Sequence, residues 1–371
     1  MINIIIILPF LLLIWMYLGY PILLFILSKI RPNMIIKKSI EPYITVIVCT
    51  FNESAVIDRR IKNLYDQEYP KEKMEIIIVD SSTDNTRNII KDKWMDKVIL
   101  IEEKKRSGKP KALNLGFEKS SNEIIILSDA PASFDSYAIK NIVRNFADPH
   151  VGAVTGKYKP IGGETIFWKF KNILRSLEGN VDSTTFLSGD LLAFRKELLE
   201  KVDEDSLADD VNIAIKIREK GYRTIYDNSS IVIEKVTNTS KDFITQKTRR
   251  AIGGIQETMR FKWMIFNLKL GLFGMFIMPT RFLFTVLNPF IFLSCLICIT
   301  YILININFYL ILSLSILFSL FIVFKKSNIV RTLINFSMTI YIQFLAVLKY
   351  LQKDLNVKWK KVKIPQLFNY P

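Results

Sequence analysis

Two long stretches of this chain contain no Asp, Glu, Lys or Arg: residues 1–28 and residues 282–324. A transmembrane helix needs about 20 consecutive apolar residues, so each stretch is long enough to cross a bilayer. Basic residues follow the first stretch directly, which is the reverse of a secretory signal and is typical of a retained anchor. The sequence therefore predicts an N-terminal transmembrane anchor at 1–30 and two spans within 282–324, joined by a turn at 305–307.

A third apolar segment, residues 332–348, has basic residues on both sides, at 325–326 and 358–361. Basic residues favour the cytoplasmic side of a membrane, so a single span here would place one of the two basic groups on the opposite side. Two alternatives stay open: a span that violates this rule, or a helix that lies in the interface. Residues 263–351 are accordingly predicted to form an interfacial helix plus two or three spans, followed by a basic tail at 352–371.

Half of the residues are hydrophobic and 23% are charged, so the charged residues are concentrated between the apolar ends, in residues 40–262. This length suits one soluble domain. Lys29 and Arg31 before the domain, with Arg260 and Lys262 after it, predict a cytoplasmic domain of an integral cell-membrane protein. The net charge is +16. Because basic residues cluster at these membrane flanks, we expect membrane lipids and no nucleic acid as partners.

Within residues 40–262, segments typical of strands and helices alternate with short connections, which predicts an α/β fold with a mainly parallel sheet. The clearest strand is 124–129, where four apolar residues precede a serine and Asp129. Polar, acid-bearing turns also follow two other predicted strands, at 52–53 and 80–84. Because parallel strands present their carboxyl ends at one edge of a sheet, we expect these turns to lie near Asp129.

A basic loop at 104–111 is expected to reach the same edge. Carboxylates beside lysines describe a site for a phosphorylated ligand with a divalent cation. The loop lacks both the spaced glycines of a dinucleotide motif and the Ser or Thr that follows the lysine of a Walker A loop. Readings that need no ligand remain: a solvated charge run for the loop, a simple turn for Asp129, and a helix cap for Asn52 or Ser54.

Two later groups of polar residues also suit such a site. Asp209 and Asp210 begin a predicted helix, where they either complement the helix dipole or keep one carboxylate available as a base. Gln246 shares a helix face with Arg249 and with Arg250, three and four residues on. An amide with clustered arginines suits an anionic leaving group.

Apolar stripes at helical spacing, interleaved with tryptophan and lysine, occur at 166–177 and 259–278. Core packing is the default reading of such a stripe. Aromatic residues alternating with lysines also suit a helix on a bilayer surface. We expect these two helices to dock the domain against the membrane.

Seven short motifs follow one another between the predicted spans. In chain order they are Thr50-Phe51-Asn52-Glu53, residues 80–86, residues 109–116, Ser128-Asp129-Ala130, Ser188-Gly189 with Arg195, Asp209-Asp210 and Gln246-Lys247-Thr248-Arg249-Arg250. Together they resemble the motifs of the membrane-integrated family 2 glycosyltransferases, which include cellulose, hyaluronan and chitin synthases and ceramide glucosyltransferase. The likeness covers about residues 43–260.

The resemblance implies an α/β fold of the GT-A (nucleotide-diphospho-sugar transferase) type, flanked by N- and C-terminal transmembrane helices, and inversion at the anomeric carbon. It also implies roles for the residues that match the motifs. These roles are nucleotide binding for Thr50, Asn52, Glu53, Asp80, Ser82, Lys109 and Asp129; catalysis for Asp209 and Asp210, with Asp210 as the base; contacts to the leaving diphosphate for Gln246, Arg249 and Arg250; acceptor contacts for Gly189 and Asp190; and metal binding for Asp129, with Mg²⁺ or Mn²⁺ as cofactor.

Two positions depart from the family motifs. Pro131 stands where the second Asp of the Asp-x-Asp site is expected, so the metal loses one expected ligand. Arg250 replaces a Trp that in processive synthases lies near the acceptor end of the channel, which favours single addition.

We therefore expect an inverting transferase that moves a sugar from a nucleotide-diphospho-sugar, with UDP as the expected nucleotide, to a membrane-lipid or lipid-linked acceptor. One alternative is a processive polysaccharide synthase with a polysaccharide acceptor. Another is a non-catalytic scaffold or transporter that retains the fold. Transporters place ionisable groups inside their spans, and residues 282–324 contain none.

Overall fold

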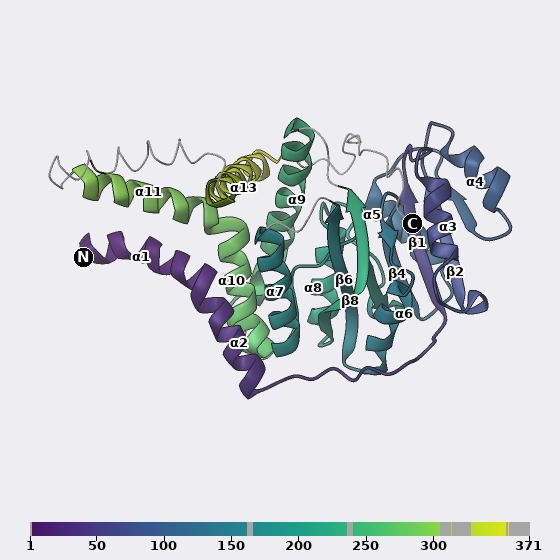
Figure 1. The fold of residues 1–371 in the computed structure, drawn as a ribbon, viewed down its shortest axis with the longest axis horizontal. Helices are drawn as coiled ribbons and strands as arrows, with labels where there is room; N and C mark the ends of the chain where they lie inside the picture. Colours follow the sequence, from purple (N-terminus) through teal and green to yellow (C-terminus); the bar gives the residue numbers. More distant parts are fainter. Residues whose placement is uncertain are drawn as a thin grey trace.

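A computed structural model describes residues 2–161, 166–235, 240–304, 313, 328–353 and 355. Its strands form one sheet with helices on both faces, and apolar helices project from one side of the domain (Figure 1). The strands are β1 (Ile44–Thr50), β2 (Met74–Asp80), β3 (Ile99–Glu102), β4 (Ile124–Asp129), β5 (Ser133–Phe134), β6 (Val151–Ile161), β7 (Leu192–Arg195) and β8 (Arg223–Lys235). The α-helices are α1 (Ile2–Ile14), α2 (Tyr20–Ile30), α3 (Ile57–Tyr65), α4 (Thr86–Trp94), α5 (Lys109–Lys119), α6 (Ala138–Val143), α7 (Ile166–Val181), α8 (Asp209–Glu219), α9 (Ser240–Arg260), α10 (Met278–Phe282), α11 (Asn288–Ile304) and α13 (Asn328–Leu351).

The sheet has the strand order β3-β2-β1-β4-β7-β6-β8-β5. β1 lies between β2 and β4 and pairs parallel with both. β7 pairs antiparallel with β4 and with β6, and β5 pairs antiparallel with β8. The remaining strands share one direction. The sheet is therefore mixed but mainly parallel, which confirms the prediction.

Alternate residues of the central strands pack on opposite faces of the sheet. In β1, Val46 and Val48 belong to the buried cluster that includes α3, α4 and α6. Ile47 belongs to the cluster on the other face, with α5 and α8. Because both faces are covered, the central strands need apolar residues at every position, which explains the unbroken apolar run at 124–127.

Two continuous helices, Ile4–Ile30 and Phe273–Ile304, are long and apolar enough to cross a membrane. They contain 27 and 32 residues. At about 1.5 Å of rise per residue, each exceeds a hydrocarbon core of about 30 Å. α1 contacts α11, so the two helices lie together (Figure 1). They correspond to the expected anchor and the first expected C-terminal span. The turn at 305–307 and most of the second expected span lie outside the described residues.

The third apolar segment forms α13, whose apolar part, Phe336–Leu351, is shorter than the other two. Ala346 and Val347 pack against Ile252 and Ile255 of α9. The helix is therefore docked on the domain through its C-terminal half.

The helix expected at 166–177 is present as α7, which packs against both β8 and α2. Leu174 joins Tyr20 and Leu24 of α2 in one buried cluster. The Tyr20 hydroxyl also donates to Glu178 Oε1 at 2.7 Å. The stripe therefore contacts the N-terminal apolar helix, and α7 lies between that helix and the sheet (Figure 1).

The amphipathic helix expected at 259–278 was a wrong prediction. Short 3₁₀ turns at Lys262–Met264 and Leu268–Leu270 separate α9 from the next helix. Phe266 and Gly271 both have φ of 58°, in the left-handed region, which a continuous right-handed helix excludes.

Candidate active site

The carboxyl ends of three central strands meet at one edge of the sheet. Thr50 at the end of β1 pairs with Asp80 at the end of β2, and Cys49 pairs with Asp129 at the end of β4. The first turns of α5 and α8 reach this edge, because Lys109 of α5 contacts both Asp129 and the first residue of α8. The strand ends and the helix starts therefore converge as the sequence pattern indicated.

Lys109 links two acidic side chains of this site. Its Nζ donates to Asp129 Oδ1 at 2.8 Å and lies 3.1 Å from Asp209 Oδ2. Gly108, with φ of 114°, and Pro110 in the first turn of α5 place the lysine. Burial disfavours the ammonium charge, but the two carboxylates hold the pKa of Lys109 well above its ordinary value. Lys109 is therefore a charged bridge between β4 and α8.

Asp190 lies beside Asp129 and forms a carboxyl pair with it. A side-chain hydrogen bond joins the two groups. Burial, and then the charge of Asp129, raise the pKa of Asp190. Burial opposes ionisation of Asp129 too, but Lys109 keeps the pKa of that carboxyl below its ordinary value. Ser188 Oγ donates to Asp190 Oδ2 at 2.7 Å, and Ser128 Oγ donates to the Asp190 carbonyl at 3.0 Å. The surroundings therefore shift the pKa values of the two carboxyls in opposite directions.

Gly189, in the loop before β7, lies next to these side chains. A β-carbon at this position would lie 3.4 Å from Lys109 Nζ and 3.9 Å from Asp209 Oδ2. The same β-carbon would lie 3.8 Å from Asp210 Cβ. The loop therefore closes over the acids, and a larger side chain would press on Lys109.

Asp209 forms an ion pair with Lys109, whereas among the residues that the structure describes no lysine is paired with Asp210. Burial, and then the charge of Asp209, raise the pKa of Asp210 from 3.8 to about 6. The charge of Lys109, and then the Val211 N–H, which donates to Asp210 Oδ1 at 2.9 Å, limit this rise in pKa. A carboxyl with this pKa is ionised at neutral pH and still basic enough to accept a proton.

Two arginines of α9 face the acids. Arg250 lowers the pKa of Asp129, Asp190 and Asp210 through its charge. Burial, and then the charge of Arg250, lower the pKa of Arg249 to about 10, and the nearby carboxylates oppose the shift. Gln246 lies on the same helix, about one turn earlier. This arrangement suits a ligand that brings negative charge to the site.

The first two acidic turns are joined to each other by hydrogen bonds. Thr50 Oγ1 donates to Asp80 Oδ1 at 2.7 Å, and Ser82 Oγ donates to the same oxygen at 2.6 Å. The Asn52 N–H donates to Ser82 Oγ at 2.7 Å. Asp80 is completely buried and forms an ion pair with Arg87 at 3.1 Å. The turns after β1 and β2 are therefore held together by hydrogen bonds, and the buried carboxylate of Asp80 accepts two of them.

The structure excludes the alternative reading of Asn52 or Ser54 as a helix cap. Asn52 and Ser54 do not cap the following helix, because α3 begins at Ile57 and its N-cap, Val56, has no side-chain cap bond. Instead, Asn52 Oδ1 accepts the Thr83 N–H at 2.8 Å, with Asn52 itself at φ of 58°. The first turn is thereby tied to the second, and Glu53 lies at its centre with its carbonyl bonded to Val56 and Ile57.

Arg195 is not part of the cluster. It pairs with Ile124, at the start of β4, and therefore lies at the opposite edge of the sheet from Asp129. Its guanidinium donates to the carbonyls of Phe146, Asp148 and Val151. Arg195 stabilises a turn, and its place in the sequence motif does not bring it to the site.

Sequence reasoning missed one residue beneath the cluster, Arg60 of α3. Arg60 is buried, stacks 4.1 Å above the ring of Phe134, and donates to Ser128 Oγ at 2.6 Å. Burial lowers the pKa of Arg60 to about 9, and Asp129 opposes this shift. The sequence did contain a signal for a buried Arg60, because this charged residue lies at helical spacing within the apolar stripe of α3.

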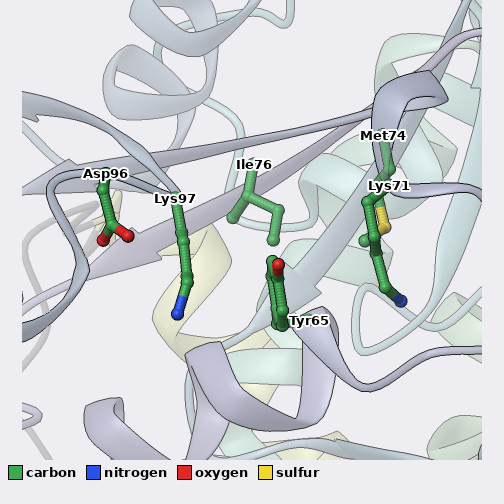
Figure 2. Close-up of a pocket in the computed structure, with 6 residues that line it drawn as sticks. All are labelled: Tyr65, Lys71, Met74, Ile76, Asp96 and Lys97. Atoms are coloured by element: carbon green, nitrogen blue, oxygen red, sulfur yellow. The ribbon is translucent and has the colours of Figure 1, made fainter.

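A separate hollow of about 180 Å³ lies near the other end of β2, away from these acids (Figure 2). Tyr65, Lys71, Met74, Ile76, Asp96 and Lys97 line it. Met74 is the first residue of β2, whereas Asp80 is the last. This hollow therefore belongs to the amino-terminal edge of the sheet.

Comparisons with known proteins relate the domain to one family. The model of glycosyl transferase family 2 matches residues 45–203. The probable glycosyltransferase YdaM of Bacillus subtilis is 28% identical over 247 residues, which cover 62% of this chain and 59% of that protein. The poly-beta-1,6-N-acetyl-D-glucosamine synthase of Staphylococcus aureus is 31% identical over 231 residues, covering 58% of this chain and 56% of the synthase. The chain thus spans less than two thirds of the length of these relatives.

Among solved structures, the mannosyltransferase PcManGT from Pyrobaculum calidifontis, in complex with GDP-Man and Mn²⁺, is similar over almost the whole chain. The TM-score is 0.77 and the identity 26%, covering 94% of this chain and 99% of the other. The fold is therefore of the GT-A type, as expected from the sequence.

Proposed function

We propose that this chain, which carries a glycosyltransferase family 2 domain, transfers a sugar from a nucleotide-diphospho-sugar to an acceptor held at the membrane surface. One observation carries the proposal: Lys109 bridges Asp129 and Asp209 at 2.8 and 3.1 Å, beside a carboxyl whose pKa is about 6. The site thus combines charged groups that can bind a diphosphate with a base that can accept the proton of a hydroxyl.

In this proposal Asp210 is the catalytic base. The acceptor hydroxyl oxygen forms a bond to the anomeric carbon, and its proton passes to the Asp210 carboxylate. The bond between that carbon and the diphosphate oxygen breaks on the opposite side, so the configuration inverts. Arg249 and Arg250 stabilise the nucleoside diphosphate that leaves with the electron pair. Gln246 supports the same leaving group, and Gly189, which has no side chain to press on Lys109, contacts the acceptor.

The donor nucleotide is proposed to bind over the joined turns at Thr50, Asn52, Glu53, Asp80 and Ser82. Their hydrogen bonds fix the edge before any ligand arrives. Arg106 of the basic loop lies 4.0 Å above the ring of Phe51, which brings the loop onto the same turn. We propose a uridine or guanosine diphosphate sugar, since the similar mannosyltransferase structure contains GDP-Man.

The acidic residues fit a divalent cation. Asp129 and Asp190 are close enough to hydrogen-bond, and their oxygens are the hard ligands that Mg²⁺ and Mn²⁺ prefer. Asp190 supplies the second carboxyl that Pro131 does not provide. Among the described residues, no group of three or more metal-ligating side chains is present, so the proposed ion takes its other ligands from phosphate and water. Such an ion, when bound, supplies charge neutralisation for the diphosphate; Mn²⁺ is present in the similar structure.

The acceptor is proposed to be a membrane lipid or a lipid-linked sugar, and the domain to lie on the cytoplasmic side of the cell membrane. Two helices suited to span a bilayer support this placement. α7 contacts one of them and also carries Arg175, whose charge interacts with the proposed base. The basic flanks at 29–38 and 260–262 agree with a cytoplasmic domain.

A polymerising synthase is the second candidate, and the 31% identity with the poly-beta-1,6-N-acetyl-D-glucosamine synthase favours it. The two candidates differ in product. Membranes containing the chain are incubated with a panel of labelled sugar nucleotides, and lipid and polymer fractions are then separated. A single labelled lipid supports the proposal, whereas a ladder of chain lengths supports the synthase. Intact donor in every reaction would instead favour the non-catalytic scaffold.

A further inference from the structure

The loop between α7 and β7, residues 182–191, brings Gly189 and Asp190 to the acids of the site. We call it the β7 loop. Threonine hydroxyls of the sheet hold this loop at two points: β8 donates to the Thr184 carbonyl at 2.7 Å, and β6 accepts the Ser188 N–H at 3.1 Å. The stretch between these two points is held instead by side chains of the surrounding helices.

Arg281 of α10 binds this stretch through the Thr185 carbonyl. Its Nη1 donates to that oxygen at 2.6 Å, and its Nε donates to Thr258 Oγ1 of α9 at 3.1 Å. Arg281 is 2% exposed, and it is the only Asp, Glu, Lys or Arg in the sequence of the apolar helix Phe273–Ile304. A charged side chain in such a helix costs free energy, which is why it occurs mainly where it has a function. Here the charged group connects the second apolar helix to the β7 loop.

Glu178 of α7 connects the same stretch to the N-terminal apolar helix. Its Oε2 accepts the Thr185 N–H at 3.2 Å and the Thr184 hydroxyl at 3.0 Å. Its Oε1 accepts the hydroxyl of Tyr20, in α2, at 2.7 Å, where α7 contacts α2 (Figure 1). Burial raises the pKa of Glu178, and these hydrogen bonds, and then the charge of Arg281, oppose the rise. The N–H and the carbonyl of Thr185 are thus held by side chains that connect to the two apolar helices.

Contacts continue along the β7 loop from Thr185 to the acids. Ser188 Oγ donates to Asp190 Oδ2 at 2.7 Å, which holds the carboxyl that pairs with Asp129. The residue between them, Gly189, lies next to the proposed base and to Lys109. Residues in one hydrogen-bonded and closely packed network are energetically coupled. A displacement of Thr185 would therefore reach the site a few residues further along the chain.

We infer that Arg281 and Tyr20 are positioning residues: from the two apolar helices they fix the β7 loop, and transfer to the acceptor depends on that contact. The apolar helices thereby support the site in addition to anchoring the chain. The dependence of transfer rests on the proposed function, in which Gly189 and Asp190 contact the acceptor. The fixing of the loop stands on the hydrogen bonds of Thr185 alone.

The test uses the full chain in nanodiscs of phosphatidylcholine. Arg281→Met removes the hydrogen bonds of the guanidinium and keeps an apolar side chain. Tyr20→Phe removes one hydroxyl and keeps the ring, so it decides the question if Arg281→Met does not fold. Hydrogen–deuterium exchange measures the protection of amides 185–191. A transfer assay at saturating Mn²⁺, with the donor and the lipid that the sugar-nucleotide panel identifies, gives kcat and the KM for each substrate.

Arg195→Met and Tyr69→Phe are the matched controls, because each removes the same kind of hydrogen bond at the other edge of the sheet. Arg195 donates to backbone carbonyls, among them that of Val151 at 3.0 Å. Tyr69 is buried, and its hydroxyl donates to the Pro42 carbonyl. Neither bond involves the β7 loop, so the controls report a general loss of stability.

We expect Arg281→Met to speed the exchange of amides 185–191 by about tenfold or more, because a hydrogen bond from a charged donor is worth that much. Tyr20→Phe should speed it by about two- to tenfold, the range for a neutral hydrogen bond. In both variants kcat/KM for the acceptor should fall by similar factors. The KM for the donor should stay within about twofold, as should both quantities in the controls, because distant sites act independently.

Unchanged exchange of the β7 loop in the folded variants would overturn the inference, as would an unchanged kcat/KM for the acceptor despite faster exchange. Equal losses in the variants and in the controls would also overturn it, since a merely structural role has that result. Failure of the proposed function looks different. In that case the wild type transfers no sugar from any donor, whereas the faster exchange is still observed in the two variants and not in the controls.

Discussion

The substitution Asp210→Asn should change the stability of the folded chain and its transfer activity in opposite directions. The pKa of Asp210 rises from 3.8 to about 6 in the folded chain, a difference of about 2. At 1.36 kcal/mol per pKa unit, ionised Asp210 costs the folded state at most about 3 kcal/mol. A carboxyl with a raised pKa favours the folded state when protonated, so this cost is absent below about pH 4 and complete above about pH 6. Asn keeps an oxygen for the Val211 N–H and carries no charge.

We therefore expect Asp210→Asn to melt higher than the wild type at pH 8, by up to roughly 6 to 12 °C for a domain of this size. The difference should vanish towards pH 4. Thermal unfolding of the detergent-purified chain, followed by tryptophan fluorescence, measures both. Asp209→Asn is the matched control, since it breaks the 3.1 Å ion pair with Lys109 and should melt lower than the wild type.

Transfer activity should fall by about 10² to 10⁴ in Asp210→Asn, while nucleotide binding remains. In the wild type, kcat/KM should decrease below about pH 6, as Asp210 becomes protonated. Full activity in Asp210→Asn would refute the assignment of the base. Equal melting temperatures of variant and wild type across the pH range would refute the electrostatic reasoning.

Four further substitutions test the surroundings of the base. Asp190→Asn should raise the Mn²⁺ concentration needed for half-maximal activity by about tenfold or more, and an unchanged metal titration would exclude Asp190 as a ligand. Lys109→Met should destabilise the domain by about 3 kcal/mol in chemical denaturation, because it leaves two carboxylates without their cation; wild-type stability would disprove the bridge. Gly253→Ala should destabilise the folded chain by about 1 to 3 kcal/mol, because the added β-carbon would lie 2.8 Å from the Leu207 backbone. Gly254→Ala should stabilise it by up to about 1 kcal/mol, because the added β-carbon would have no atom within 4 Å. Equal effects of the two alanines would contradict the close packing of α9.

The parts of this fold that depend on local pattern could be predicted from the sequence. The apolar run at 124–127 identified β4 because both faces of the sheet are covered. Asp209 and Asp210 likewise indicated the start of a helix, and α8 begins at Asp209. In each case the determining interactions lie within a few residues of the signal.

The parts that depend on distant contacts could not be predicted. Asp190 reaches Asp129 only because β7 inserts antiparallel beside β4, and no local signal indicated this pairing. Lys171 reads in the sequence as an exposed lysine on an amphipathic helix, whereas in the structure it is only partly exposed and lies 5.6 Å from the ring of the distant Phe186. At 259–278 the apolar spacing suggested a helix, but the left-handed turn at Gly271 overrode it.

The most direct test of the account is the structure of the full chain with Mn²⁺ and a nucleotide sugar that is not hydrolysed. We predict that the diphosphate lies between Lys109 and the arginines of α9, with the anomeric carbon facing Asp210. A nucleotide bound instead in the hollow lined by Tyr65 and Lys97, at the other edge of the sheet (Figure 2), would contradict it.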